Sequence, residues 1–356
     1  MPSLIDTMSK KIAGFEPYYF HGPFKDYTRP GGWRPRRLYN FVYMYLGLPL
    51  LLLRFRPEFV LVRTAPPGIQ MWGSFLGKLL GMKMICWMMD YHPEIENRYL
   101  RKRGFGLVAN VIEKIDKLAM QNFIATVALD EAMAALCRPR VGNKPVIVHP
   151  TWGREEITFQ PATSRDSFEG VIRLGYVGNL GAGHDLVGFG NLLQKLKEHV
   201  DVELYVIGCS ANGEQRFKEF ALEHRVECSI EGRLAFSELG TLYERLGIDY
   251  GIVLMKDFYA GVMSPSKFSG YLDFGIPLVY IGPELTNADL VASKFGAGIS
   301  LANTATDEQY EKAASQMLLI EEKESFHANA AVAAKYFHSR NAESLAAELI
   351  NLIEIK

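Results

Sequence analysis

The feature that most constrains the fold of this chain is a regular alternation of short apolar runs with helical patterns. One series of runs begins at Phe59, and a second begins at Ile172. Short apolar strands separated by helices are typical of parallel sheets covered on both faces. Because 356 residues exceed what one ordinary core holds, we expect two Rossmann-like α/β domains.

Each series predicts its own set of elements. The first predicts strands over Phe59–Arg63, Lys83–Met88, Phe123–Val127 and Val146–His149, and helices over Gly68–Leu80, Phe105–Met120 and Asp130–Cys137. The second predicts strands over Ile172–Val177, Val202–Ile207, Val226–Ile230, Tyr250–Leu254 and Leu278–Ile281, and helices over Leu186–His199, Gly213–His224 and Phe236–Leu246.

Between the two series, the polar stretch Thr151–Gly170 has no periodicity and is predicted to be a linker. We therefore expect one domain over 1–160 and another over 170–330. The segment 333–356 contains an amphipathic helical pattern over Asn341–Ile353, and we expect this helix to cross back to the first domain. At the other end, a helix is predicted over Leu4–Ala13 and a strand over Tyr18–Phe20.

Composition excludes several classes of protein. The net charge of −1 argues against a general nucleic-acid binder. The four cysteines are scattered without metal-ligand spacing, which is typical of buried thiols in a reducing compartment. No cleavable signal sequence is evident near Met1.

A membrane-surface segment is predicted over 33–56. The apolar run Leu38–Leu53 is shorter than the about 20 residues that a bilayer-spanning helix needs. Arginines flank it on both sides, and tyrosines lie within it, a composition suited to an anionic membrane surface. A buried core helix with solvated arginines at its ends explains the same residues.

A phosphate site is predicted where a short helix begins near Ser266. Lys267 lies in its first turn, where a cation opposes the helix dipole unless an anion binds there. Ser264 and Ser266 offer further contacts, and an ordinary Ser/Pro cap with a solvated lysine is the structural alternative.

A second phosphate turn is predicted between the first strand and first helix of the second series. Its candidate residues are Gly178, Asn179, Gly181 and His184, and His184 is a candidate for a positive contact to a diphosphate. Glycines allow backbone N–H groups to approach a phosphate closely. The spacing lacks the three glycines of a dinucleotide fingerprint.

Acidic and imidazole groups follow the strand that ends at Met88. Asp90, His92 and Glu94 lie at the carboxyl end of this strand, where open α/β sheets bind ligands. We interpret them as catalytic candidates, while capping of the following helix by the two acids is the structural alternative.

These motifs resemble those of a known enzyme class. Pro265-Ser266-Lys267, followed by Gly275-Ile276-Pro277, looks like the donor-diphosphate segment of glycosyltransferases of the GT-B fold. More narrowly, it resembles family 4 enzymes of O-antigen, capsule and exopolysaccharide synthesis in bacteria. Asp90-Tyr91-His92-Pro93-Glu94 resembles the Asp-Leu-Trp-Pro-Glu signature of the fucosaminyltransferase-like branch.

The resemblance implies two Rossmann-like domains that face each other across a cleft, with the first strand missing or atypical here. It also implies a retaining hexosyl or related transferase that binds a nucleotide-diphosphate sugar, UDP rather than GDP. Since the sequence has no Asp-x-Asp motif, we expect neither a metal nor another cofactor. The acceptor would be lipid-linked or a free saccharide, and the enzyme would be cytoplasmic and peripheral on the inner face of the membrane.

Roles for individual residues follow from the same resemblance. Asp90 would face the acceptor hydroxyl, and Glu94 would orient the loop or its neighbours. Thr64, beside a Pro-Pro turn, would contact the acceptor. Arg233 would lie near the nucleobase. Gly270 stands where the family's ribose-binding glutamate is expected, so Asp273 is the candidate substitute.

Two other functions remain open. The atypical start and Gly270 would also fit a non-catalytic GT-B subunit that supports a partner glycosyltransferase. A nucleotide-sugar epimerase shares the fold, but the apolar run Leu38–Leu53 argues against it.

Overall fold

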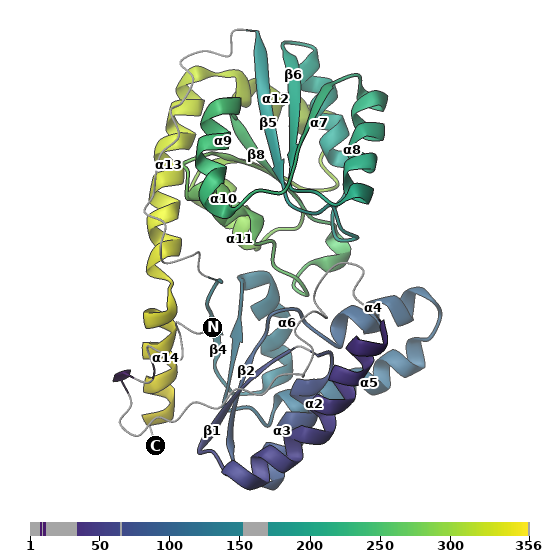
Figure 1. Ribbon diagram of the computed structural model, residues 1–356, viewed down its shortest axis with the longest axis vertical. Helices are drawn as coiled ribbons and strands as arrows, with labels where there is room; N and C mark the ends of the chain where they lie inside the picture. The colour runs from purple at the N-terminus through teal and green to yellow at the C-terminus, as the bar shows by residue number, and fades with distance from the viewer. Residues whose placement is uncertain (1–7, 9, 12–33, 65, 152–169, 355–356) are drawn as a thin grey trace. The chain divides into compact units, whose positions relative to one another are not determined.

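The computed structural model describes residues 8, 10–11, 34–64, 66–151 and 170–354. The chain divides into two compact units. Unit 1 comprises Met1–His149, Gly261–Met263 and Ala342–Lys356, and unit 2 comprises Pro150–Ala260 and Ser264–Asn341. Figure 1 shows a separate sheet in each unit. The two predicted Rossmann-like halves are therefore present as α/β units.

Unit 1 contains a four-stranded parallel sheet with the strand order β1-β2-β3-β4. The strands are β1 (Phe59–Arg63), β2 (Lys83–Trp87), β3 (Ala125–Ala128) and β4 (Val146–Val148). In this sheet each strand lies beside the strand that precedes it in sequence, and right-handed crossovers then place the helices that connect the strands on one face. The helices of unit 1 as a whole are α2 (Arg34–Phe55), α3 (Ile69–Leu79), α4 (Glu94–Lys102), α5 (Gly106–Met120), α6 (Glu131–Val141) and α14 (Ala342–Glu354).

Close packing of α3 on the sheet depends on a glycine. A Cβ atom at Gly77 would lie 2.4 Å from Cγ of Met84, which is fully buried in β2. Next to α3 on either side pack α2 and α5, and α5 also packs against α6. These helices form one layer over the sheet (Figure 1).

Unit 2 contains a six-stranded parallel sheet with the order β10-β9-β8-β5-β6-β7. Its strands are β5 (Val171–Val177), β6 (Asp201–Ile207), β7 (Glu227–Glu231), β8 (Tyr250–Leu254), β9 (Leu278–Ile281) and β10 (Gly298–Leu301). After β7 the chain returns to the other side of β5 to form β8. This reversal is a topological switch point, and open α/β sheets bind ligands outside the carboxyl ends of the strands there.

Helices cover both faces of this second sheet (Figure 1). They are α7 (Val187–Lys197), α8 (Ala211–His224), α9 (Leu239–Leu246), α10 (Lys267–Leu272), α11 (Asn287–Asp289), α12 (Asp307–Leu318) and α13 (Ile320–Ser339). The Nζ of Lys323, on α13, lies 2.7 Å from Oδ1 of Asp249, and both side chains are buried. This ion pair attaches α13 to the sheet of unit 2.

Several elements were not expected from the sequence. They are α4, β10, α12 and α13. The segment 333–356 is divided between the end of α13 and α14, and α14 belongs to unit 1, where Ser344 contacts His149 at 2.9 Å. The elements expected over Leu4–Ala13 and Tyr18–Phe20 lie outside the described residues, apart from residues 8, 10 and 11, which are helical. Residues 152–169 of the predicted linker also lie outside them.

Candidate functional site

A tight glycine turn follows β5 at the switch point of unit 2. Gly178 has a φ of +89°, a value that favours glycine, and its N–H donates to the Ile207 carbonyl at 2.8 Å. A Cβ atom at Gly178 would lie 3.4 Å from Cε of Lys267. The two segments that the sequence assigned to the donor therefore lie against each other, although about 90 residues separate them in the chain.

Lys267 is held in this turn without an acidic partner. Its Nζ donates to the Asn179 carbonyl at 2.8 Å and to the Tyr176 hydroxyl, and it lies 4.0 Å from the centroid of the Tyr176 ring. No ion pair joins Lys267 to a carboxylate within the part of the chain that the structure describes. Burial lowers the pKa of Lys267 to about 7, while Cys209 acts in the opposite direction. A partly desolvated cation with no counter-ion is suited to bind an anion.

His184 does not supply the second cation expected at this turn. Its Nδ1 accepts a hydrogen bond from the Gly181 N–H at 3.0 Å. Burial and the charge of Lys267 lower the pKa of His184 to about 4, so the ring is neutral near pH 7. Its predicted role as a positive contact to a diphosphate is therefore corrected to that of a neutral group that stabilises the turn.

Two cations that the sequence analysis missed border the same turn. Arg216, on α8, donates to the Leu180 carbonyl at 3.2 Å. The Lys256 N–H donates to the Gly183 carbonyl at 2.8 Å, and both cations act to lower the pKa of His184. Lys256 lies two residues beyond β8, and this position at the switch point was the signal that could have identified it.

Of the remaining donor candidates, two lie near Lys267. Ser266 is exposed at the start of α10, and Ser264 accepts from Asn287 Nδ2 at 3.4 Å. Since α10 has only six residues, the Lys267 side chain rather than a helix dipole provides the positive charge. Arg233 is exposed beyond β7, with its Cα 3.8 Å from a Cβ placed on Gly208.

Asp273 is not available as the predicted ribose contact. Its side chain is buried, and its Oδ1 lies 2.7 Å from His338 Nε2 on α13. Burial raises the pKa of Asp273, and the bond to His338 opposes this effect. Asp273 therefore attaches α13 to α10, and the sequence could not reveal this because its partner lies 65 residues away.

In unit 1, the loop that follows β2 places Asp90 and His92 at the surface. Asp90 is exposed, and partial desolvation raises its pKa, while the charges of His92 and Arg63 act to lower it. His92 Nδ1 lies 2.5 Å from Glu96 Oε1, and its backbone carbonyl accepts a hydrogen bond from Gln70. A carboxylate on Nδ1 leaves Nε2 as the second ring nitrogen available to a ligand.

Two other candidates of unit 1 have structural contacts instead. Thr64 is 1% exposed, and its hydroxyl accepts from the Met89 N–H at 3.1 Å. Glu94 is 8% exposed, and its carboxylate bonds Arg140 at 2.7 Å and Arg98 at 3.2 Å. Thr64 is therefore corrected from an acceptor contact to a support of the loop, because the Met89 N–H occupies its buried hydroxyl. Glu94 has contacts that orient the loop, as the resemblance implied, and is corrected as a catalytic candidate because Arg140 and Arg98 occupy its carboxylate.

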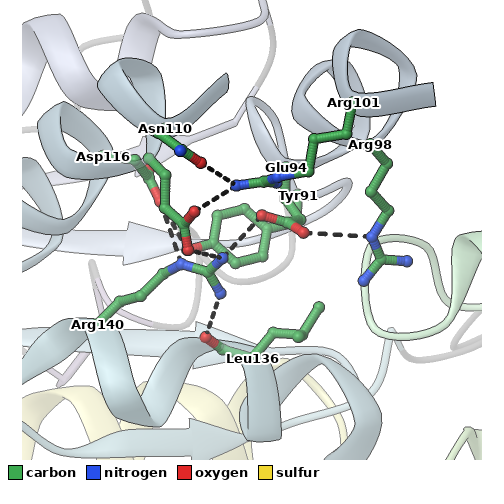
Figure 2. A network of polar contacts seen from close by, with 9 residues as sticks. Tyr91, Glu94, Arg98, Arg101, Asn110, Asp116, Leu136 and Arg140 are labelled. Atoms are coloured by element: carbon green, nitrogen blue, oxygen red, sulfur yellow. Dashed lines mark hydrogen bonds and ion pairs between the residues drawn. The ribbon is translucent and has the colours of Figure 1, made fainter. Parts of the chain in front are cut away.

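Arg140, on α6, is the centre of this supporting network (Figure 2). It bonds Glu94, lies 3.5 Å from Glu113 and 3.8 Å from Asp116, and donates to the Leu136 carbonyl. The Tyr91 hydroxyl donates to Asp116 Oδ2 at 2.9 Å. Burial raises the pKa of Asp116 to about 6, although Tyr91 and Arg140 oppose this effect.

One group of side chains in unit 2 has metal-ligand geometry. Glu198, His199 and Glu311 offer ligand atoms within 4.8 Å of one another, and it is the single such group found among the described residues. It is solvent-accessible, and Lys195 lies 3.5 Å from Glu198 and 3.8 Å from Glu311. A lysine in this position competes with a metal ion for the two carboxylates.

These two units, each with a parallel sheet, form the GT-B fold, which similar solved structures share. The sequence matches no protein-family profile and no curated protein.

Three similar structures are two glycosyltransferases by name and one complex with UDP-glucose. The pneumococcal O-GlcNAc transferase GtfA in complex with UDP and GlcNAc has a TM-score of 0.55 and 10% identity, over 86% of this chain and 59% of that one. Anabaena Alr3699/HepE in complex with UDP-glucose has a TM-score of 0.57 and 11% identity, over 86% of this chain and 81% of that one. The lipopolysaccharide outer core galactosyltransferase WaaB, in its apo form, has a TM-score of 0.55 and 12% identity, over 86% of this chain and 80% of that one. The chain thus spans less than two thirds of GtfA.

Proposed function

We propose that this protein is a glycosyltransferase whose unit 2 binds the diphosphate of a nucleotide-sugar donor. The observation that carries the proposal is the position of Lys267, half-buried against the turn at Gly178 with no ion pair to an acid among the described residues. The UDP and UDP-glucose complexes of GtfA and HepE support a uridine nucleotide rather than GDP. Arg216 and Lys256 add positive charge around the same turn.

The proposed chemistry needs no metal. When the sugar leaves, negative charge develops on the diphosphate, and cations placed there in advance stabilise it. Lys267 would bear most of this role. Among the predicted site residues of unit 1, Asp90 and His92 are the accessible ones, and we assign the acceptor hydroxyl to them.

The stereochemical course has two candidates. The resemblance to family 4 predicts retention, with the departing phosphate taking the proton of the acceptor hydroxyl and Asp90 positioning that hydroxyl. The contact between His92 and Glu96 favours a second course. In this second course, His92 Nε2 takes the proton of the acceptor hydroxyl, and the hydroxyl oxygen bonds to the anomeric carbon of the sugar. The diphosphate leaves with the electron pair of its bond to that carbon, and the configuration is inverted. The anomeric configuration of the product, assigned by NMR, decides between them.

For the acceptor, we propose a lipid-linked saccharide used in the synthesis of a cell-surface polysaccharide such as O-antigen, capsule or exopolysaccharide. WaaB, a lipopolysaccharide transferase by name, gives weak support to this class. The protein would then act in the cytoplasm, peripheral on the inner face of the membrane.

A non-catalytic subunit that supports a partner transferase is the second candidate. Burial of Asp273 and the glycine at position 270 favour it, because neither position offers a carboxylate to a ribose. Such a subunit would bind no nucleotide in isolation.

Calorimetry of UDP and GDP binding without added metal tests the donor site. We expect UDP to bind the natural protein, and Lys267→Ala to weaken binding about 10- to 100-fold, as expected for the loss of a charge-assisted contact of about 1.5–3 kcal/mol. Lys218→Ala, at an exposed lysine of the same unit, is the control and should bind normally. A folded natural protein that binds neither nucleotide would favour the non-catalytic subunit.

A further inference from the structure

The outer face of α5 is apolar, although helices on a sheet normally present a polar face to water. Five large apolar residues repeat with helical spacing within about 100° of one another, and all five are exposed. They are Leu107, Val108, Val111, Ile115 and Leu118. Leu107 is 85% exposed, while Ala109 and Met120, toward the opposite side, are buried. The stripe is therefore not part of the core of unit 1.

The neighbouring helices have the same property. On α3, the exposed apolar side chains Trp72, Phe75 and Leu79 lie along one side. On α2, they are Leu38, Tyr39, Val42, Tyr43, Leu46, Leu50 and Leu53. Since α3 packs against both α2 and α5, these stripes belong to adjacent helices of one layer. We call these fifteen residues of the three helices the three-helix apolar face.

Positive charge accompanies this face. Over residues 38–58, 69–79 and 99–120, eight exposed side chains are cationic: Arg54, Arg56, Lys78, Arg101, Lys102, Arg103, Lys114 and Lys117. In the same ranges, Glu58 is the single exposed acid, and Glu113 is partly buried and bonded to Arg101. An apolar surface with this charge bias complements an anionic lipid bilayer.

The contacts of α2 distinguish lying on a membrane from spanning one. Among the described residues, α2 contains the one stretch long and apolar enough to cross a bilayer, Leu38–Phe55 with a mean hydropathy of 1.4. Its Tyr45 carbonyl, however, accepts a hydrogen bond from Trp72 Nε1 on α3 at 3.0 Å, and its Tyr45 hydroxyl donates to the Pro67 carbonyl. These contacts attach α2 along unit 1, as expected for a helix parallel to a membrane surface.

We propose that the three-helix apolar face is a membrane-docking surface, with all three stripes inserted at the headgroup boundary of an anionic bilayer. The sequence indicated a membrane segment over 33–56 alone, whereas the structure adds α3 and α5 to the contact. This proposal does not depend on donor binding by unit 2, so either one can fail without the other.

Co-sedimentation of the full chain with vesicles tests the docking surface. We expect binding to vesicles of phosphatidylcholine with 30% phosphatidylglycerol, at least tenfold weaker binding to pure phosphatidylcholine, and weakening by salt. The combined variant L107S/V111S/L118S should bind anionic vesicles at least tenfold more weakly. Because these side chains are exposed, the variant should keep the circular dichroism and UDP binding of the natural protein.

The matched control places serine at exposed apolar positions of unit 2. Val187 and Leu222 are 69% and 82% exposed, and V187S/L222S should bind vesicles as the natural protein does. Equal vesicle binding by the natural protein and the α5 variant would overturn the proposal. A second result would also overturn it: the natural protein binds no vesicles but forms a concentration-dependent dimer, and the α5 variant abolishes this dimer. That result would assign the face to a second copy of the chain.

Discussion

Two cations packed on tyrosine rings, the buried Arg140 of unit 1 and the half-buried Lys267 of unit 2, have different partners. Arg140 of unit 1 lies 5.3 Å from the centroid of the Tyr91 ring, and Lys267 of unit 2 lies 4.0 Å from that of Tyr176. Arg140 has three carboxylates within 4 Å. Among the described residues, Lys267 forms no such pair and donates to neutral oxygens.

The difference indicates which cation is structural and which is available to a ligand. A buried charge with its counter-ions in place is strongly destabilising to disrupt, because the charges left behind have no partner. A buried cation without a counter-ion carries a desolvation cost that an anionic ligand can offset. We therefore assign Arg140 to the stability of unit 1 and Lys267 to binding in unit 2, and four experiments test this assignment.

The largest expected effect is on stability. Arg140→Ala removes the cation that Glu94 and Asp116 share, leaving Arg98 on Glu94 and the neutral Tyr91 hydroxyl on Asp116, and we expect it to destabilise unit 1 by about 3–5 kcal/mol in urea denaturation. Arg138→Ala on the same helix removes an exposed ion pair with Glu131 and should cost less than about 1 kcal/mol. Equal stability of the two variants would remove Arg140 from its structural role.

A smaller effect is expected from the titration of Asp116. Its pKa of about 6 in the folded protein is above the ordinary value of 3.8, so the folded state binds more protons between these values. Asp116 makes its full contribution to the free energy of unfolding below about pH 4. This contribution, up to about 3 kcal/mol, is lost as the pH rises through 6. Asp116→Asn should remove this part of the pH dependence, as followed by urea denaturation between pH 4 and 7. An unchanged slope in the variant would contradict the raised pKa.

The third effect concerns donor affinity and pH. Because the pKa of Lys267 is about 7, the ammonium form dominates below this pH, and binding of a diphosphate above it requires proton uptake. UDP affinity should fall as the pH rises above 7, by at most tenfold or about 1.4 kcal/mol per pH unit. Calorimetry in buffers of different ionisation enthalpy should detect the proton uptake, and Lys267→Met should lose it. Uptake that persists in Lys267→Met would assign the proton to another group.

The smallest effect is the change in stability on removal of Lys267. Lys267→Met removes the desolvation cost that lowers the pKa of Lys267, but it also removes the hydrogen bonds to Tyr176 and Asn179, so we expect the free energy of unfolding of unit 2 to stay the same or to rise by about 1 kcal/mol. The same urea experiment as for Arg140→Ala measures it. A loss similar to that of Arg140→Ala would show that the two cations are not different after all.

The local sequence pattern correctly indicated the position of some candidate site residues, whose roles stay predictions. Asp90 and His92 are accessible beyond β2, and Lys267 lies at the turn of Gly178, because both positions follow from strand ends and helix starts. The pattern was wrong for Glu94 as a catalytic candidate and for Asp273 as a ribose contact, because Arg140 and His338, 46 and 65 residues away in sequence, occupy their carboxylates. No local pattern records such pairs.

By itself, the sequence determined the alternation of strands and helices, and hence two α/β units with ligand-binding loops at the carboxyl ends of parallel strands. That pattern is local, because strand and helix periods are set by neighbouring residues. The tertiary structure alone decided which charges have partners and which apolar stripes are covered. An apolar helical stripe such as that of α5 has the same sequence whether it faces a core or solvent, and only the packing of the other elements decides between the two.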